Sequence, residues 1–232
     1  MTTTSSDLVA LGLTQTYGSG LNAAHALIDV ELTIAAGESV AIMGPSGSGK
    51  TTLLHCLAGI LRPTAGSITW RGADLTTLSD ARRTVLRRED FGFVFQSGQL
   101  LPELPAVENV ALPLMLAGTS RRDACAVASR WIDHLGLAGL QDRRPGELSG
   151  GQAQRVAIAR ALVGAPGAVF ADEPTGALDR ATGHDTMQVL TESTRAAGAT
   201  LVVVTHDPEV ARWCSRTIQV QDGRITTEAM TR

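Results

Sequence analysis

One lysine stands alone among 232 residues, and it lies in a phosphate-binding pattern. Lys50 belongs to the string Gly44-Pro45-Ser46-Gly47-Ser48-Gly49-Lys50-Thr51, which fits G-x-x-x-x-G-K-[ST]. A compact ammonium fits as a point charge between phosphate oxygens, whereas a guanidinium is planar and wider. A buried strand is expected before the loop, over 39–43, and a helix after it, over 51–61. Because this arrangement directs backbone N–H groups at an anion, the string predicts a nucleoside triphosphate site.

Two adjacent carboxylates follow a second apolar strand. The strand is expected over 168–171, and Asp172 and Glu173 come at its carboxyl end, where open α/β sheets bind ligands. Two carboxylates in this place are costly unless something uses them. Asp172 is suited to hold Mg²⁺ together with the Thr51 hydroxyl, and Glu173 to polarise an attacking water as general base. The simpler alternative is an acidic pair that caps the next helix.

A serine and two glycines begin another predicted helix. The string is Leu148-Ser149-Gly150-Gly151-Gln152, and the helical pattern continues to Leu162. Taken alone, Ser149 with Gln152 three residues later is a capping box. The two glycines cost helix stability, yet they let backbone amides approach an anion closely. They therefore favour a second phosphate contact.

Together these strings resemble the ATP-binding subunit of an ABC transporter, over about Leu8 to Gly223. Two single residues join the comparison: Tyr17 as an adenine-stacking aromatic and His206 as the switch histidine. A half-buried strand tyrosine is the alternative for Tyr17, and a solvent-facing side chain is the alternative for His206. The full set, in the family's order, is Tyr17, the P-loop 44–51, Gln96 as the Q-loop, the signature 148–152, Walker B ending at Asp172 and Glu173, the D-loop 176–179, and His206.

The resemblance implies a fold and a role for each residue. The fold class would be α/β, a P-loop NTPase (RecA-like) core with a mainly parallel sheet, an antiparallel β-subdomain and a helical subdomain. One ATP-binding domain would cover 7–232, with the helical subdomain inserted at about 97–165 and residues 1–6 flexible. The catalytic residues would be Glu173, His206 and Gln96, and the magnesium ligands Thr51, Gln96 and Asp172. The ATP-binding residues would be Tyr17, Gly44, Pro45, Ser46, Gly47, Ser48, Gly49, Lys50, Thr51, Thr52, Ser149, Gly150, Gly151, Gln152 and Asp179.

The resemblance also implies partners. The enzyme would be an ATPase, with ATP and Mg²⁺ held between the P-loop of one copy and the signature helix of a second copy packed head to tail. Asp179 would cross that interface. An integral-membrane permease would contact the Q-loop and the helical subdomain, so that the protein would be cytoplasmic and peripheral on the inner face of the membrane. Segments 92–96 and 108–114 resemble the subgroup with the lipoprotein-releasing, macrolide-efflux and cell-division ATPases.

Two positions depart from the family's pattern. Gly98 and Gln99 stand where a Phe-Asn pair is common, in the segment that contacts the permease. Ala153 follows the signature where a second glutamine is frequent. The first departure puts the shape of the permease-binding groove in doubt, and the second should matter little for ATP.

Bulk composition excludes several other classes. A net charge of −3 argues against a nucleic-acid partner, and we expect the pairs 82–83 and 87–88, all arginine, on solvated helix faces. Three scattered cysteines fit buried residues of a reducing compartment better than a disulfide frame or a zinc site. We expect no signal peptide and no membrane-spanning run.

Two other uses of such an ATPase disagree with the sequence, and a third stays open. ABC ATPases of DNA repair carry long coiled-coil or zinc-bearing insertions that this chain lacks, and translation-factor ATPases carry two cassettes, where this chain has one P-loop. The remaining alternative is the ATPase subunit of a non-transporting regulatory membrane complex that controls cell-wall or division events.

Overall fold

The computed structural model describes residues 8–230, and the expected flexibility of residues 1–6 falls outside this range. The chain divides into two compact units, which are described one at a time. The first contains 8–87 and 202–230 of the described residues, and the second contains 88–201. The domain bounds expected from the sequence stay a prediction. Among the described residues no helix is both long and apolar enough to span a bilayer.

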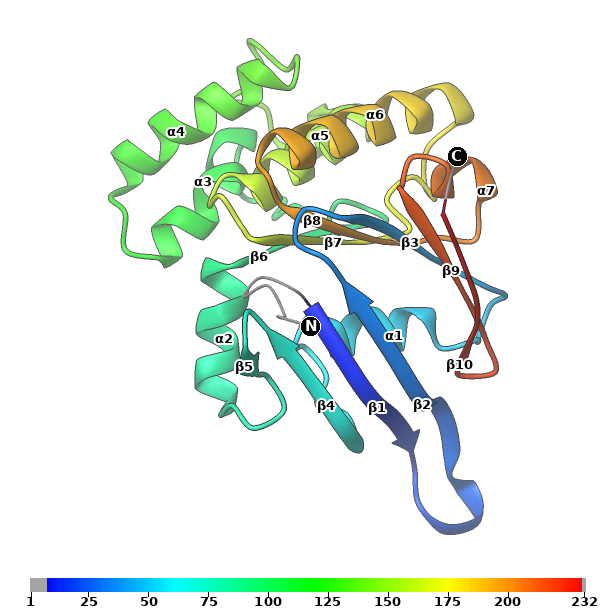
Figure 1. The fold of residues 1–232 in the computed structure, drawn as a ribbon. Helices are drawn as coiled ribbons and strands as arrows, with labels where there is room; N and C mark the ends of the chain where they lie inside the picture. The colour runs from blue at the N-terminus through cyan, green and yellow to red at the C-terminus, as the bar shows by residue number, and fades with distance from the viewer. Residues whose placement is uncertain (1–7, 231–232) are drawn as a thin grey trace. The chain divides into compact units, whose positions relative to one another are not determined.

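An antiparallel sheet makes up one part of the first unit (Figure 1). Its strands β1 (Leu8–Tyr17), β2 (Ala24–Ile34), β4 (Ala65–Trp70) and β5 (Ala73–Asp74) lie in the order β2-β1-β4-β5. Strand β1 is ten residues long. The strand continues to Tyr17 because residues 15–17 still pair with β2, after register shifts, although their polar side chains give no apolar alternation. A 3₁₀ turn, η1 (Gly20–Asn22), joins the two strands.

Parallel pairing organises the rest of the first unit. Strand β3 (Ser39–Met43) pairs parallel with β9 (Arg216–Gln221), and β9 pairs antiparallel with β10 (Arg224–Met230). On the other side of β3 lies β8 (Thr200–Val204), whose first two residues belong to the second unit. Buried apolar side chains fill β3 and β8, as expected of strands covered on both faces.

Three helices belong wholly or mainly to the first unit. They are α1 (Lys50–Leu57), α2 (Asp80–Glu89) and α7 (Pro208–Ala211). The expectation of solvated arginines is wrong at two positions on α2. Arg83 is buried beside Asp80, and Arg87 donates to the Gly59 carbonyl at 2.7 Å. Each guanidinium group finds an acceptor, although Nε of Arg83 is buried without a partner, and burial lowers the pKa of Arg87.

The second unit combines two parallel strands with a group of helices. Strands β6 (Phe91–Phe95) and β7 (Ala168–Asp172) pair in parallel with Phe95 opposite Asp172. The helices are α3 (Ala106–Leu116), α4 (Arg121–His134), η2 (Pro145–Glu147), α5 (Gly150–Leu162) and α6 (Arg180–Ala196). Helix α5 packs on β6 so closely that a Cβ on Gly92 would lie 2.3 Å from the Ala161 carbonyl oxygen. Glycine is therefore required there.

A serine caps helix α4, and all three cysteines are free thiols. The cap of α4 is Ser120, whose hydroxyl accepts from the Asp123 amide at 3.2 Å. The three cysteines are unpaired, and burial raises the pKa of Cys56 and of Cys214 to about 12.

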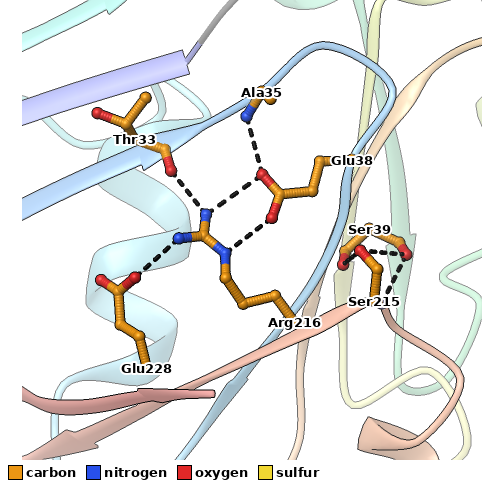
Figure 2. A network of polar contacts seen from close by, with 7 residues as sticks. All are labelled: Thr33, Ala35, Glu38, Ser39, Ser215, Arg216 and Glu228. Atoms are coloured by element: carbon orange, nitrogen blue, oxygen red, sulfur yellow. Dashed lines mark hydrogen bonds and ion pairs between the residues drawn. The ribbon is translucent and has the colours of Figure 1, made fainter. Parts of the chain in front are cut away.

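Arg216 joins three segments of the first unit at the start of β9 (Figure 2). Its Nε atom lies 2.7 Å from Glu38 Oε1, and its Nη1 atom donates to Glu228 on β10 at 2.7 Å. Its Nη2 atom donates to the Thr33 carbonyl on β2 at 2.6 Å. The Arg216 side chain is only 15% exposed, so these charge-assisted bonds are weakly screened. The network fastens β9 to β10 and to the β2–β3 turn.

We expect Arg216→Met to lower the free energy of unfolding by about 2 kcal/mol, because it leaves two carboxylates without their cation. Urea denaturation followed by circular dichroism measures the change. Arg224→Met is the matched control, since Arg224 is an exposed arginine on the neighbouring strand. Equal stability of the two variants would contradict a structural role for the network.

Candidate functional site

The glycine-rich loop of the first unit is held against two strands. It joins β3 to α1, and three of its residues, Gly44, Gly47 and Gly49, have positive φ angles. A Cβ on Gly44 would lie 2.0 Å from the Val220 carbonyl oxygen, and one on Gly49 would lie 2.2 Å from the Ala26 carbonyl oxygen. No larger residue fits at either position. The close approach fixes the loop while its backbone curls around the Lys50 side chain.

Lys50 is buried inside this loop. It is 8% exposed, and its ammonium donates to the carbonyl oxygens of Gly44 and Pro45, at 2.8 Å each. The Ser48 hydroxyl is buried without a hydrogen-bond partner. Helix α1 begins here with Gly49 as its cap and with no side-chain acceptor for its first amides. A cation, a hydroxyl without a hydrogen-bond partner and a helix N-terminus without a side-chain cap together fit a phosphate group.

The other predicted residues of the first unit lie at strand ends. Tyr17 is the last residue of β1 and is 47% exposed, so its ring has an accessible surface. His206 is exposed and follows β8, and the preceding Thr205 amide donates to the Ile42 carbonyl at 3.1 Å. The residues that follow β8 and β3 therefore leave the sheet at the same edge, which brings His206 to the end of β3 where the P-loop begins.

In the second unit, Gln96 and the two carboxylates leave the sheet side by side. Phe95 is paired with Asp172 in the parallel register, so Gln96 and Glu173 are the next residues on neighbouring strands. Glu173 has a φ of +47°, a strained conformation for a residue with a side chain and one that is common at functional sites. The alternative in which the acidic pair caps the next helix is wrong, because the cap of α6 is Asp179.

The D-loop contacts the Q-loop. A Cβ on Gly176 would lie 2.8 Å from Nε2 and 3.1 Å from Cδ of Gln96, so the glutamine side chain lies directly against this glycine. Asp179, at the end of the same loop, accepts from the amides of Ala181 and Thr182 at 3.1 Å each. The Thr182 hydroxyl also donates to it and lowers the pKa of the Asp179 carboxyl. Asp179 is thus an ionised cap in this unit.

The signature string forms the capping box that its sequence predicts. The Gln152 amide donates to Ser149 Oγ at 3.3 Å, and the Ser149 amide donates to Gln152 Oε1 at 2.8 Å. The glycines have a packing reason as well. A Cβ on Gly151 would lie 2.4 Å from Cγ2 of Thr182 on α6, and one on Gly150 would lie 3.1 Å from Cδ2 of Leu178. The start of α5 therefore packs against the D-loop and α6.

The described part of the chain contains no cluster of three or more His, Cys, Asp or Glu side chains able to hold a metal ion. Mg²⁺ at nucleotide sites is commonly held by one or two protein groups together with substrate phosphates, so the residues present fit that mode of binding. Sequence reasoning missed Arg160 on α5, which contacts the segment after Gln96. Only its place on an otherwise apolar helix face could have pointed to it.

Comparison with known proteins assigns the family. Residues 27–176 match the family model described as ABC transporter. The chain belongs to the ABC transporter family. It is 46% identical to the lipoprotein-releasing system ATP-binding protein LolD of Geobacter metallireducens, over 97% of this chain and 100% of that protein. It is 46% identical to the macrolide export ATP-binding/permease protein MacB of Sodalis glossinidius, over 95% of this chain and 34% of that protein.

A solved structure confirms the fold class. The ATP-binding cassette MJ0796, in a dimeric post-hydrolysis state with ADP and phosphate, matches with a TM-score of 0.88 and 41% identity, over 97% of this chain and 99% of that chain. The predicted α/β fold and the predicted ABC ATPase are therefore confirmed, as is the predicted subgroup. The chain is therefore an ATP-binding cassette that hydrolyses ATP.

Two glycines of the P-loop give a sharp comparison. We expect Gly49→Ala to abolish ATP binding and to lower the free energy of unfolding by about 2 kcal/mol or more, because its Cβ meets the Ala26 carbonyl. Gly47→Ala should lower the free energy of unfolding by only about 1 kcal/mol, which is the strain of its positive φ. No atom lies within 4 Å of its added Cβ. Urea denaturation and titration with a fluorescent ATP analogue measure both quantities. Equal effects would mean that close packing does not define the loop.

Proposed function

We propose that this chain is the ATP-hydrolysing subunit of a membrane export or release system of the LolD and MacB kind, and that two copies close head to tail on ATP. One observation carries the proposal: the chain has a single P-loop and a single signature helix, and it resembles a cassette solved as a dimer with ADP and phosphate. One copy offers each phosphate-binding element once. A second copy would supply the missing partner for each.

Binding begins at the P-loop. The buried Lys50 ammonium exchanges its contacts with the Gly44 and Pro45 carbonyls for phosphate oxygens, and the amides of Gly47, Gly49 and Thr52 surround the phosphates. The remaining loop residues, Pro45, Ser46, Ser48 and Thr51, complete this set. The Tyr17 ring stacks on the adenine. Stacking needs only an accessible aromatic face, which Tyr17 has at the end of β1.

Hydrolysis requires a base and a charge-neutralising ion. Thr51, Gln96 and Asp172 would hold Mg²⁺, which supplies positive charge to the phosphate oxygens. Glu173 accepts a proton from the attacking water, and His206 fixes that water and contacts the terminal phosphate. The strained backbone at Glu173 supports this assignment.

Closure depends on the terminal phosphate. Ser149, Gly150, Gly151 and Gln152 of the second copy contact it at the start of α5, and Asp179 reaches the interface. ATP contacts both copies, whereas ADP leaves the signature helix without its phosphate. A ligand shifts a conformational equilibrium only through such a difference in contacts. ATP therefore favours the closed dimer, and hydrolysis reopens it.

The closing and reopening of the dimer would act on an integral-membrane permease. LolD is named as the ATP-binding protein of a lipoprotein-releasing system, and MacB as a combined ATP-binding and permease protein. By analogy this chain would bind its permease through the Q-loop and the helical segment 97–165, on the cytoplasmic face of the membrane. These names speak of release and export, which favours transport over the regulatory alternative without transport.

Glu173→Gln tests the catalytic assignment. We expect the variant to bind ATP like the parent, to lose turnover by about 100-fold or more, and to accumulate a dimer with ATP. Phosphate release and sedimentation velocity measure the two effects. Glu192→Gln is a matched control, because Glu192 is an exposed carboxylate on α6. Parent-like hydrolysis by Glu173→Gln would refute its role as base, and a monomer with ATP would refute the paired site.

Co-expression with a candidate integral-membrane permease tests the partner. We expect the two proteins to copurify from detergent-solubilised membranes. Leu101→Glu should reduce recovery at least about tenfold, because Leu101 is an exposed apolar side chain just after the Q-loop. Leu11→Glu changes a leucine on β1 that is somewhat more exposed, 53% against 41% for Leu101, and should have no effect. If both variants copurify equally well, the Q-loop region is not the permease contact.

A further inference from the structure

The segment that follows Gln96 makes a tight turn with an unusual backbone. Gly98 and Gln99 both have positive φ angles, +69° and +46°, and the Gly98 amide donates back to the Phe95 carbonyl at 2.9 Å. The left-handed region suits glycine, but it is unfavourable for a residue with a side chain such as Gln99. A strained turn of this kind persists only when its surroundings hold it.

One face of α5 holds this turn. Gln154, which is buried, donates from Nε2 to the Phe95 carbonyl at 2.9 Å. Two turns further along, Arg160 donates from Nη2 to the Gly98 carbonyl at 2.6 Å and from Nη1 to the Gln99 carbonyl at 2.8 Å. A Cβ on Gly98 would lie 3.5 Å from the Ala153 carbonyl oxygen and 3.5 Å from Cβ of Ala157. Positions 153, 157 and 160 recur at helical spacing, so the turn lies along a single stripe of the helix.

The arginine fork is suited to this contact. Two N–H groups in a fixed plane reach two successive carbonyl oxygens, and both bonds are charge-assisted. Burial lowers the pKa of Arg160, although a guanidinium keeps its charge at neutral pH. Because the acceptors are backbone atoms, the contact does not depend on the side chains at 98 and 99. That independence accounts for how a Gly-Gln pair can occupy this turn.

The same helix begins with the signature string. Ser149 caps α5, and Arg160 lies ten residues beyond its first residue, Gly150. An α-helix is a stiff rod over such a length, about 15 Å. A displacement of the 96–99 turn would therefore be passed to the signature end of α5 without loss, provided that the turn and the helix stay joined.

We propose that Arg160 is a positioning residue that ties the turn 96–99 to α5, so that Gln96 and the signature end of the helix move as one piece. The inference rests on the proposed function, in which Gln96 and the signature residues act on ATP. The tie itself lies within the second unit and exists whether or not ATP is hydrolysed. Its two consequences, for the turn and for turnover, can therefore be measured separately.

Three variants test the tie: Arg160→Met, Arg160→Lys, and the control Arg155→Met. Arg155 lies on the same helix, but its guanidinium points toward Gly136, where an added Cβ would be 3.5 Å from Nη1. Amide hydrogen exchange of the nucleotide-free protein, followed by NMR, reports on the turn. We expect the Gly98 and Leu101 amides to exchange at least about tenfold faster in Arg160→Met, with the amides of α5 unchanged.

Steady-state ATPase assays report on turnover. We expect Arg160→Met to lower kcat about tenfold while KM for ATP stays within about twofold, because the P-loop is untouched. Arg160→Lys, which can reach one carbonyl but lacks the fork, should give intermediate values of exchange and kcat. Arg155→Met should match the parent in both assays.

Several results would overturn the inference. Parent-like exchange and kcat in Arg160→Met would show that the turn needs no tie. A parallel loss of kcat, ATP affinity and thermal stability, with no recovery in Arg160→Lys, would show that Arg160 serves stability alone. If the parent itself fails to hydrolyse ATP, the proposed function fails, yet the exchange experiment still decides whether Arg160 holds the turn.

Discussion

A buried ammonium held by backbone carbonyls is the interaction on which the rest of the first unit depends. The Lys50 side chain can lie inside its loop only because Gly44 and Gly49 press against the carbonyls of Val220 and Ala26. Those carbonyls belong to β9 and β2, so both strands must be in place before the loop has its shape. The Arg216 network fastens β9 to the β2–β3 turn. The shape of the phosphate-binding loop therefore depends on the assembly of the strands around it, through close contact between backbones.

Local sequence patterns were sufficient to predict several strands and the capping of one helix. Strand β3 has the predicted bounds, and β7 is one residue longer than predicted, since each is a short apolar run between clear turn residues. The capping box at Ser149 needs only four consecutive residues, and it formed as predicted. The P-loop pattern likewise predicted the order of strand, loop and helix, although it gave no sign of the contacts with Val220 and Ala26 that hold the loop. Where an element is specified by its neighbours along the chain, the sequence was enough.

Contacts between segments far apart in the chain could not be predicted from the sequence. Strands β9 and β10 alternate weakly and were not predicted, because their place is set by pairing with β3 and by Arg216. Arg83 and Arg87 look like surface charges until α2 is packed. Gly176 looks like part of a motif, yet it is small because the Gln96 side chain lies against it. For Arg87 and Gly176 the deciding atoms are tens of residues away, in Gly59 and Gln96.

The glycines of the signature string show how one sequence feature can satisfy two demands. Gly151 must be small for α5 to pack beside Thr182, and its exposed neighbour Gly150 is limited by Leu178. A side chain at Gly151 would push α6 from the helix start, and one at Gly150 would push the D-loop, whatever its effect on phosphate. The D-loop also bears on Gln96 through Gly176. Q-loop, D-loop and signature helix thus form one packed cluster within the second unit. A displacement of any one of them is passed to the other two, because close-packed side chains transmit displacement and do not absorb it.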